Sequence, residues 1–436
     1  MKVGKVHIGV AVLLFGFALM VPLGASVPAG AAVRISMYAA AGPDQKPLFD
    51  RQLAEFRKIH PDVKVKLILA PWAQYATKLQ TLIGAGDTPD VMWLIAGAGV
   101  AFDVTAFAKK GIILDLAPYV RFEGTGVIPA VLDLMRVDGG IYAVPFEFNN
   151  LLLYYNKDIF DKAGLEYPTE DWTWEDMLSD AKKLTRDFNG DGRIDQYGIS
   201  NAADTYVNDL WIWQAGGEVF NGDGTKVMFD TPEALKGLGF WTDLMYTYKV
   251  SPPHSVQAQQ AFGSLMTGRL AMSWGTGTWE VTALSEVDFM WGAVLLPEGP
   301  AGNRTTLQRA NGWAVAKDSP HKDAAVNLAK FLGMGKGLDI WASSGRLAPY
   351  ERFTPEYYLK IAEVPERHRA GWLEVNREAL KNIPNGRGHP RADLYNKVNQ
   401  VLTNELEWVW NGKKDLARAL REAQEHANQL LIQEKR

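Results

Sequence analysis

The sequence predicts an α/β fold in which a mostly parallel sheet is covered by helices. Short apolar strands and amphipathic helices alternate in the first part of the chain. This order is typical of parallel sheets, whose strands are joined by helical crossovers. The chain has 436 residues, of which 47% are hydrophobic. That length and apolar content allow two sizeable cores and exclude a disordered chain.

The first strand and helix are indicated by their hydrophobic periodicity. Residues 33–38 form a short apolar run. In the segment 47–59, Phe49, Leu53 and Phe56 recur at the spacing of one helix face. We therefore expect a strand followed by a helix that buries this face.

The next three elements complete the alternating order. In residues 63–69, apolar side chains alternate with lysines at the start and dominate at the end, as expected for a strand that becomes buried. A helix is predicted at about 74–83. The glycines and proline after it lead into a strand at 90–94.

A hairpin is predicted in the middle of the chain. Asp138-Gly139 lies between two short apolar runs, 135–137 and 141–144. Asp-Gly is a strong signal for a tight hairpin turn. A further apolar strand is expected at 151–155.

Capping residues mark later helices. Thr173, with Asp176 three residues on, predicts a capping box for a helix that ends near residue 186. Ser319-Pro320 predicts the cap of another helix. Residues 392–436 have the pattern of two amphipathic helices separated by Asn411-Gly412.

The N-terminus is typical of a secretory signal peptide. Two lysines precede an apolar run, 8–21, that is too short to cross a bilayer as a helix, and small residues follow it. We assign residues 1–32 to this signal, with cleavage after Ala31 or Ala32. The mature chain is then exported and has no membrane-inserted segment.

The absence of cysteine narrows the class of protein further. It excludes a disulfide framework, a zinc-thiolate site, a cysteine nucleophile and a lipid-modified N-terminal cysteine. We therefore expect a free periplasmic protein. The formal net charge of -4, without a long basic run, argues against nucleic acid as a partner.

Catalytic signatures are mostly absent. No pair of the seven histidines has the spacing of a helical zinc site, and no glycine-rich nucleotide motif is present. Residues 271–275 come near a nucleophile elbow but lack its first glycine. Glu147, Asp204 and Glu280 could still converge as glycosidase carboxylates. A secreted carbohydrate-active enzyme is therefore an alternative.

The segment 187–195 has the ligand spacing of a calcium loop. The candidate ligands are Asp187, Asn189, Asp191, Asp195 and the carbonyl of Arg193. Gly198 stands where a calcium loop has a bidentate glutamate, and a solvated turn without metal is the alternative. The sequence thus allows a structural calcium ion and indicates no required cofactor.

Several motifs occur in order along the chain and together carry a resemblance. They occupy residues 84–93, 144–160, 268–279, 311–317 and 411–414, and they follow the signal peptide. In this combination the chain resembles the carbohydrate-type extracellular solute-binding proteins of ABC importers. Maltose-binding and glycerol-3-phosphate-binding proteins belong to that family.

The resemblance implies a two-lobed periplasmic binding protein fold, with a hinge and an interlobe ligand cleft. The implied N-terminal lobe comprises residues 33–145 plus 293–332, and the C-terminal lobe 146–292 plus 333–436. The crossings between lobes are expected near 144–149, 290–294 and 331–335.

The implied function is capture of a sugar or oligosaccharide and its delivery to the permease of an ABC importer by a monomeric binding protein. Fifteen tryptophans suit this ligand, because aromatic rings stack on the apolar faces of sugars. A binder of glycerol-3-phosphate or of a glycerophosphodiester is the alternative within the family.

The resemblance also assigns ligand-binding positions. Asn149 stands where maltose-binding protein supplies an acidic ligand. Asp204 and Tyr206 resemble the acid and aromatic that grip the sugar. Trp279 matches the stacking tryptophan of the family.

Four further positions come from later motifs. Asn311 and Gly312 match a strand start whose backbone approaches the ligand. Arg346 occupies a place where relatives often carry tyrosine, and Arg391 lies in a segment that resembles the loop from which glycerol-phosphate binders present an arginine. If both arginines face the cleft, they favour an anionic group. The alternative is that both are surface charges.

Trp72 and Trp93 are candidates for a different reason. Both lie at or beside predicted strand ends. In open α/β sheets the loops at strand ends carry the binding groups. The alternative for each is a place in the core.

Overall fold

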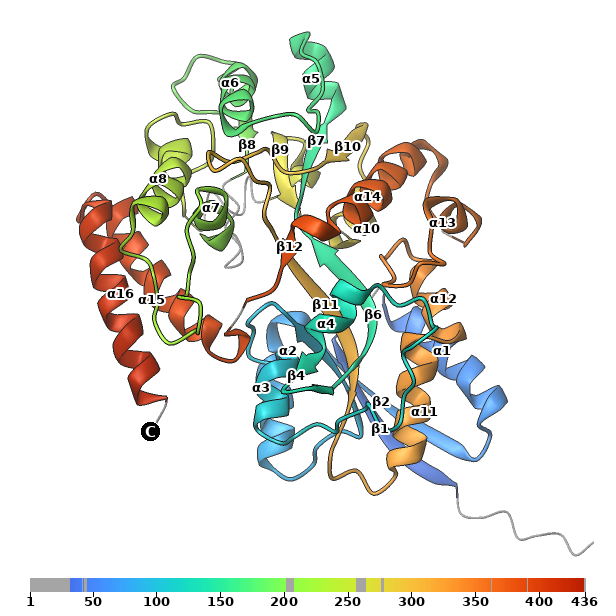
Figure 1. Cartoon of the computed structure of the whole chain (residues 1–436). Coiled ribbons are helices and arrows are strands. Elements are labelled where there is room, and N and C mark those ends of the chain that lie inside the picture. The colour runs from blue at the N-terminus through green and yellow to red at the C-terminus, as the bar shows by residue number, and fades with distance from the viewer. Residues whose placement is uncertain are drawn as a thin grey trace, which may run out of the picture.

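The computed structural model of this chain is a mixed α/β molecule built on two sheets (Figure 1). The described residues are 32–40, 42, 45–200, 208–255, 264–275, 278–361, 363–389 and 391–434. Apart from its last residue, the predicted signal peptide lies outside them. Within this part of the chain, no helix has the length and apolar character needed to span a bilayer.

The first sheet is mainly built from the N-terminal strands. Its members are β1 (Val33–Ala40), β2 (Val63–Ala70), β3 (Val91–Ala96), β6 (Val144–Asn150), β11 (Thr306–Val315) and β12 (Gly386–Arg387). The strand order is β12-β11-β3-β1-β2, and β6 also pairs with β11. β1 runs parallel to β2 and β3, whereas β11 is antiparallel to β3 and β6.

The second sheet has the order β10-β7-β9-β8. Its strands are β7 (Leu152–Asn156), β8 (Tyr197–Ile199), β9 (Leu270–Gly275) and β10 (Trp291–Val294). A separate hairpin pairs β4 (Arg136–Val137) with β5 (Gly140–Ile141). Asp138 and Gly139 both have positive φ at its turn, which confirms the predicted Asp-Gly hairpin.

Helices cover both sheets. They are α1 (Lys46–Ile59), α2 (Trp72–Gly84), α3 (Val104–Lys109), α4 (Pro129–Leu134), α5 (Lys157–Ala163), α6 (Trp174–Leu184), α7 (Asn208–Gln214), α8 (Pro232–Tyr246), α10 (Thr278–Leu284), α11 (Lys322–Gly333), α12 (Lys336–Ala342), α13 (Pro355–Ile361), α14 (Arg369–Lys381), α15 (Ala392–Trp410) and α16 (Leu416–Gln433). Short 3-10 turns occur at Leu265–Thr267, Glu366–His368 and Ile383–Asn385. Figure 1 shows α15 and α16 side by side, as the sequence predicted for the C-terminal pair.

The two predicted caps have different outcomes. Thr173 and Asp176 form the expected capping box of α6. Ser319 does not cap α11, which begins at Lys322 after His321. The Ser319 hydroxyl instead donates to Asp90 Oδ1 at 2.6 Å. The Ser-Pro prediction was therefore wrong, because the helix begins later than expected and the Ser319 hydroxyl accepts the N–H of His321, the residue before the helix, at 3.2 Å.

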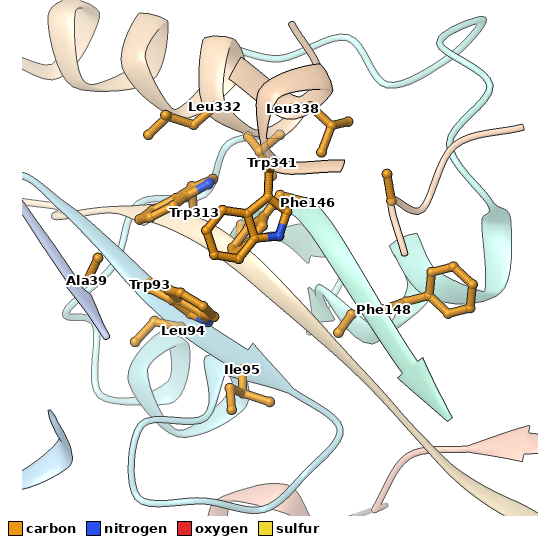
Figure 2. Close-up of a cluster of buried hydrophobic side chains, with 14 of the residues drawn as sticks. Ala39, Trp93, Leu94, Ile95, Phe146, Phe148, Trp313, Leu332, Leu338 and Trp341 are labelled. Carbon is orange, nitrogen blue, oxygen red and sulfur yellow. The ribbon is translucent and has the colours of Figure 1, made fainter. Parts of the chain in front are cut away.

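A cluster of large aromatic side chains fills the core between the first sheet and α12. Trp341 extends from α12 over Phe146 of β6 and Trp313 of β11, with Trp93 on the neighbouring strand (Figure 2). The ring centroids of Phe146 and Trp313 lie 4.9 Å apart, and those of Trp93 and Trp341 lie 5.5 Å apart. Such pairs each stabilise the fold by about 0.5–1.5 kcal/mol beyond the area they bury.

The chain passes between the sheets at places that differ from the predicted lobe boundaries. β6 belongs to the first sheet and β7 to the second, so the first passage lies at Leu151 rather than before Phe146. Both strands are buried along their whole length, so the apolar pattern has no break at the passage. The return lies between Val294 and Thr306, where β10 ends and β11 begins.

The later passage also falls after the expected 331–335. α12 packs against α1 on the first sheet, whereas α14 packs against β10 and β7 of the second. The chain therefore leaves the first sheet after residue 342, and β12 returns to pair with β11. The extents of the two lobes themselves stay a prediction.

Candidate functional site

A row of polar side chains lies on one face of the β6–β11 pair. Glu147 is paired with Asn311, and Asn149 with Arg309, across the antiparallel ladder. Residues directly opposed in a ladder share a face, and so do residues two apart on one strand. All four side chains project to the same side of the sheet, which we call the polar face.

The polar face is shielded from solvent. The exposed fraction is 3% for Glu147, 4% for Asn149 and 6% for Asn311. Burying a charge or an amide costs free energy unless the group is paired or hydrogen-bonded. Because apolar residues would fill a purely structural interior at lower cost, this burial makes the polar face a candidate binding site.

Glu147 is the centre of the hydrogen bonding on this face. Trp341 Nε1 donates to its Oε2 at 2.8 Å, and Asn149 Nδ2 donates to its Oε1 at 3.2 Å. Arg346 Nη1 lies 3.6 Å from Oε2. The Arg346 guanidinium also sits over the Trp341 ring, 4.8 Å from its centroid. One carboxylate thus organises an amide, an indole and a guanidinium.

The backbone around Arg346 is held by Tyr358. The Tyr358 hydroxyl donates to the Arg346 carbonyl at 2.9 Å and accepts from the Ala348 N–H. Burial raises the pKa of Tyr358, so the hydroxyl keeps its proton at physiological pH. The loop that presents Arg346 is therefore fixed before any ligand arrives.

Two buried polar atoms near this face lack partners among the described residues. They are Asn311 Oδ1 and Trp93 Nε1. Asn311 is opposite Ile95 on β3, and Trp93 is two residues before Ile95 on the same side of that strand. Leaving a buried donor or acceptor unsatisfied costs about 1–3 kcal/mol. A hydroxyl group suits both atoms, because it donates to the amide oxygen and accepts from the indole.

A second polar cluster joins β12 to two helices. His389 Nδ1 lies 2.7 Å from Asp209 Oδ2 of α7, and the Tyr395 hydroxyl of α15 donates to Asp209 Oδ1 at 2.7 Å. The His389 and Tyr395 rings are stacked, with centroids 3.5 Å apart. All three residues are buried. We call them the His389 cluster.

The His389 cluster contacts the end of β3. His389 N–H donates to the Gly97 carbonyl at 3.1 Å. A Cβ on Gly99, which has φ +65°, would lie 2.5 Å from Tyr395 Cβ. Gly99 N–H donates to the buried Asp103 at 3.2 Å. The C-terminal helices therefore meet the first-sheet side of the molecule at a glycine-lined contact.

The sequence motifs point neither to Glu147 as a binding-site organiser nor to the His389 cluster. The sequence suggests Glu147 only as a glycosidase carboxylate, because its indole and guanidinium contacts come from α12 and the following loop. His389 lies in the segment chosen for Arg391, but its partner Asp209 is distant in sequence. No local pattern indicates such a pairing.

Three of the predicted site residues meet on the polar face, namely Asn149, Asn311 and Arg346. Trp93 is buried, and it packs between Phe146 and Trp341 as part of the core. Trp72 is 49% exposed at the first residue of α2, with its ring 6.2 Å from that of Trp93. A ligand-facing platform at Trp72 stays a prediction.

The structure shows contacts within the protein for Gly312 and Arg391, and their ligand-binding roles stay predictions. A Cβ on Gly312 would lie 2.7 Å from Ala143 Cβ, so packing against that residue requires glycine here. Arg391 donates to Asp393 at 3.2 Å and to the Gly224 carbonyl at 2.9 Å. These bonds tie the start of α15 to a neighbouring turn.

Three predicted positions lie outside the described part of the chain. These are Asp204, Tyr206 and the side chain of Trp279. Their roles stay predictions.

The calcium-like loop is closed by its own backbone. Asp187 accepts from Gly190 and Gly192 N–H at 2.7 and 2.8 Å. Asn189, Asp191 and Asp195 each accept a similar backbone bond, and the Arg193 N–H supplies the one to Asp191. Among the described residues, no three His, Cys, Asp or Glu side chains gather in a metal-binding arrangement. Calcium here stays a prediction.

The arrangement of sheets matches that of known two-lobed proteins. An ABC substrate-binding protein of Listeria monocytogenes, solved in complex with cycloalternan, superimposes with a TM-score of 0.77 and 27% identity, covering 92% of this chain and 99% of that one. The class of protein is therefore that of the two-lobed periplasmic binding proteins, as predicted.

The family follows from the sequence comparison. The bacterial extracellular solute-binding protein family matches residues 41–333, and the chain belongs to this family. A putative binding protein of Brucella abortus is 24% identical over 395 residues, which cover 88% of this chain and 90% of the relative. The sn-glycerol-3-phosphate-binding periplasmic protein of Pectobacterium atrosepticum is 23% identical over 416 residues, covering 91% and 90%.

The chain is thus the solute-binding component of an ABC importer. The predicted family, fold class and transport role are confirmed. The alternative of a secreted carbohydrate-active enzyme was wrong, since the family consists of binding proteins.

Proposed function

We propose that the solute is a neutral sugar or oligosaccharide, bound between the lobes against the polar face and then delivered to the membrane permease. The observation that carries this proposal is the pairing of the arginines. Arg346 faces Glu147 at 3.6 Å, and Arg391 faces Asp393 at 3.2 Å. The two arginines that the family motifs suggested for an anionic ligand therefore each have a carboxylate beside them.

The chemistry of the polar face suits hydroxyl groups. Amide, carboxylate and guanidinium groups lie side by side, and each bonds sugar hydroxyls well. Asn311 Oδ1 offers an acceptor on this face that is buried without a partner among the described residues. The half-exposed ring of Trp72 adds an apolar surface of the kind on which sugar rings stack.

We infer that the chain works as a free monomer in the periplasm. The apolar run 8–21 and the small residues after it support export by a signal peptide at residues 1–32, and the absence of cysteine supports a protein without a lipid anchor. The periplasmic relative from Pectobacterium supports the compartment.

A second candidate ligand is glycerol-3-phosphate or a glycerophosphodiester. Two arginines, Arg309 and Arg346, reach the polar face, and paired guanidinium groups suit phosphate. The Pectobacterium relative is named for sn-glycerol-3-phosphate. We rank this candidate second because Glu147 lies beside Arg346.

A thermal-shift series decides between the two. Maltose, maltotriose, trehalose and cellobiose are compared with sn-glycerol 3-phosphate and glucose 6-phosphate. A ligand at 100 times its Kd stabilises the folded state by about 2.7 kcal/mol, which raises Tm by several degrees. A shift with a neutral sugar alone supports the proposal. A shift only with the phosphate esters contradicts it.

A further inference from the structure

We propose that Glu147 is the specificity-determining residue of this site and makes it select an uncharged ligand. Glu147 positions Asn149 and Arg346 and offsets the charge of the guanidinium. The inference rests on the proposed function, because it concerns the same polar face.

The backbone aims Glu147 at its partners. The β6–β11 register shifts between Asn311 and Gly312, so Asn311 pairs with Glu147, Gly312 pairs with Pro145, and Phe146 is left unpaired. Such a bulge redirects the side chains beside it and often lies next to a functional site. The Phe146 ring stacks on Trp313, and the adjacent Glu147 carboxylate reaches the indole of Trp341.

The carboxylate is bound from three separate segments. Asn149 comes from β6 itself, Trp341 from α12, and Arg346 from the loop after α12. The side chains of Arg346 and Glu147 are each only 4% exposed. At this burial a charge interacts strongly with its neighbours, because little water screens it. The charge of Glu147 is therefore felt by any ligand group that contacts Arg346.

Arg346 has contacts besides Glu147, and we expect them to keep it in place when the Glu147 charge is removed. Its guanidinium rests on the Trp341 ring, and its carbonyl is bonded by Tyr358. Replacing Glu147 by glutamine keeps the side-chain shape and the acceptor for Trp341. The substitution raises the net charge of the cluster by one unit beside a positioned guanidinium. The site should then attract a phosphate or carboxylate group.

The test measures selectivity by titration calorimetry. The variants are Glu147→Gln, the double variant Glu147→Gln/Arg346→Gln, and Glu123→Gln as the control, since Glu123 is exposed beside Arg121. The neutral probes are maltose, maltotriose, trehalose and cellobiose, and the anionic probe is glucose 6-phosphate. For Glu147→Gln we expect at least tenfold weaker binding of the neutral sugar and at least tenfold tighter binding of glucose 6-phosphate.

The double variant distinguishes a change in affinity caused by the charge from one caused by impaired folding. It removes both charges, and replacing a buried ion pair as a unit is far less disruptive than breaking it. We expect it to lose the gain in glucose 6-phosphate binding, while Glu123→Gln behaves as the unmodified protein. A purely structural role for Glu147 predicts equal losses for both kinds of ligand.

The two hypotheses fail in different ways. If the unmodified protein prefers glucose 6-phosphate to every neutral sugar, the proposed function fails. If it binds a neutral sugar but Glu147→Gln gains no affinity for glucose 6-phosphate, only the inference about Glu147 is overturned. The inference about Glu147 is also overturned by a further combination of results. In that case Glu147→Gln does not fold, whereas the double variant folds and binds glucose 6-phosphate better than the neutral sugar.

Discussion

The hydroxyl of Thr306 bonds both backbone groups of Leu151. It accepts the Leu151 N–H at 3.0 Å and donates to the Leu151 carbonyl at 3.2 Å. Leu151 is the residue at which the chain passes from the first sheet to the second, and Thr306 begins β11 after the return passage. Asn382, at the end of α14, donates to the same carbonyl at 2.9 Å. Three passages between the sheets thus meet at one residue, Leu151, and are joined by side chains.

A substitution at Thr306 tests whether its bonds to Leu151 stabilise the passages between the two sheets. Thr306→Val keeps the shape of the side chain but leaves the buried Leu151 N–H without its acceptor, while Asn382 still bonds the Leu151 carbonyl, so we expect a loss of about 1–3 kcal/mol in unfolding free energy. Urea denaturation measures it, and hydrogen exchange at Leu151 should rise. Thr247→Val is the control, because the Thr247 hydroxyl bonds Asp243 at an exposed site. Equal effects of the two variants would contradict the role of Thr306.

A substitution at Gly99 tests whether the contact between the end of β3 and α15 matters for sugar binding. Gly99→Ala places a Cβ against Tyr395, so we expect it to weaken sugar binding by holding α15 away from the β3 end. Gly124→Ala is a matched control, since Gly124 also has positive φ, at +75°, but has open space around it. Both variants carry a backbone cost of about 1–2 kcal/mol. If ligand affinity falls equally in both, the Tyr395 contact is irrelevant to binding.

The raised pKa of the buried Asp103 should make the stability of the protein depend on pH. Burial raises the pKa of Asp103 to about 6. Hydrogen bonds from the N–H groups of Thr105 and Gly99 oppose this rise only in part. Because the folded pKa lies above the unfolded value near 4, this group favours the folded state most below pH 4, and that contribution is lost as pH rises through 6.

The corresponding substitution is Asp103→Asn. It removes the cost of burying the charge, so we expect a gain of about 1–3 kcal/mol at pH 7 and little change at pH 4. Denaturation curves at the two pH values measure the difference. An Asp103→Asn protein that is less stable than the parent at pH 7 would refute the assignment.

Calcium binding at residues 187–195 is tested by melting the protein in excess calcium and in chelator. We expect calcium to raise Tm, because Asp187, Asn189, Asp191 and Asp195 place oxygen atoms at ligand spacing. Asp187→Ala should abolish the shift. Identical Tm values with calcium and with chelator would leave a metal-free turn, held by the backbone bonds to Asp187.

Local signals in the sequence predicted local structure well. The Asp138-Gly139 turn and the Thr173 capping box depend on residues within a few positions, and both occur as expected. The Ser319 cap was wrong because α11 begins only at Lys322, and the Ser319 hydroxyl accepts the His321 N–H and donates to Asp90, which is far away in sequence. The passage at Leu151 was hidden because it joins two wholly buried strands.

The candidate site was only partly predictable for the same reason. Asn149, Asn311 and Arg346 came from family motifs, and the strand register brings them together. The partner of Arg346, Glu147, depends on a bulge that no sequence pattern indicates. His389 follows β12 and Asp209 lies in α7, and the fold brings these two distant segments within 2.7 Å of each other.

The central claim is that this binding protein carries a neutral sugar between its lobes. Native mass spectrometry of the protein, with the ligand retained through purification, tests it most directly. We expect a bound mass that matches a neutral monosaccharide or oligosaccharide, lost on denaturation, and no phosphorus in the released ligand. A bound phosphate ester, released in stoichiometric amount, would contradict it.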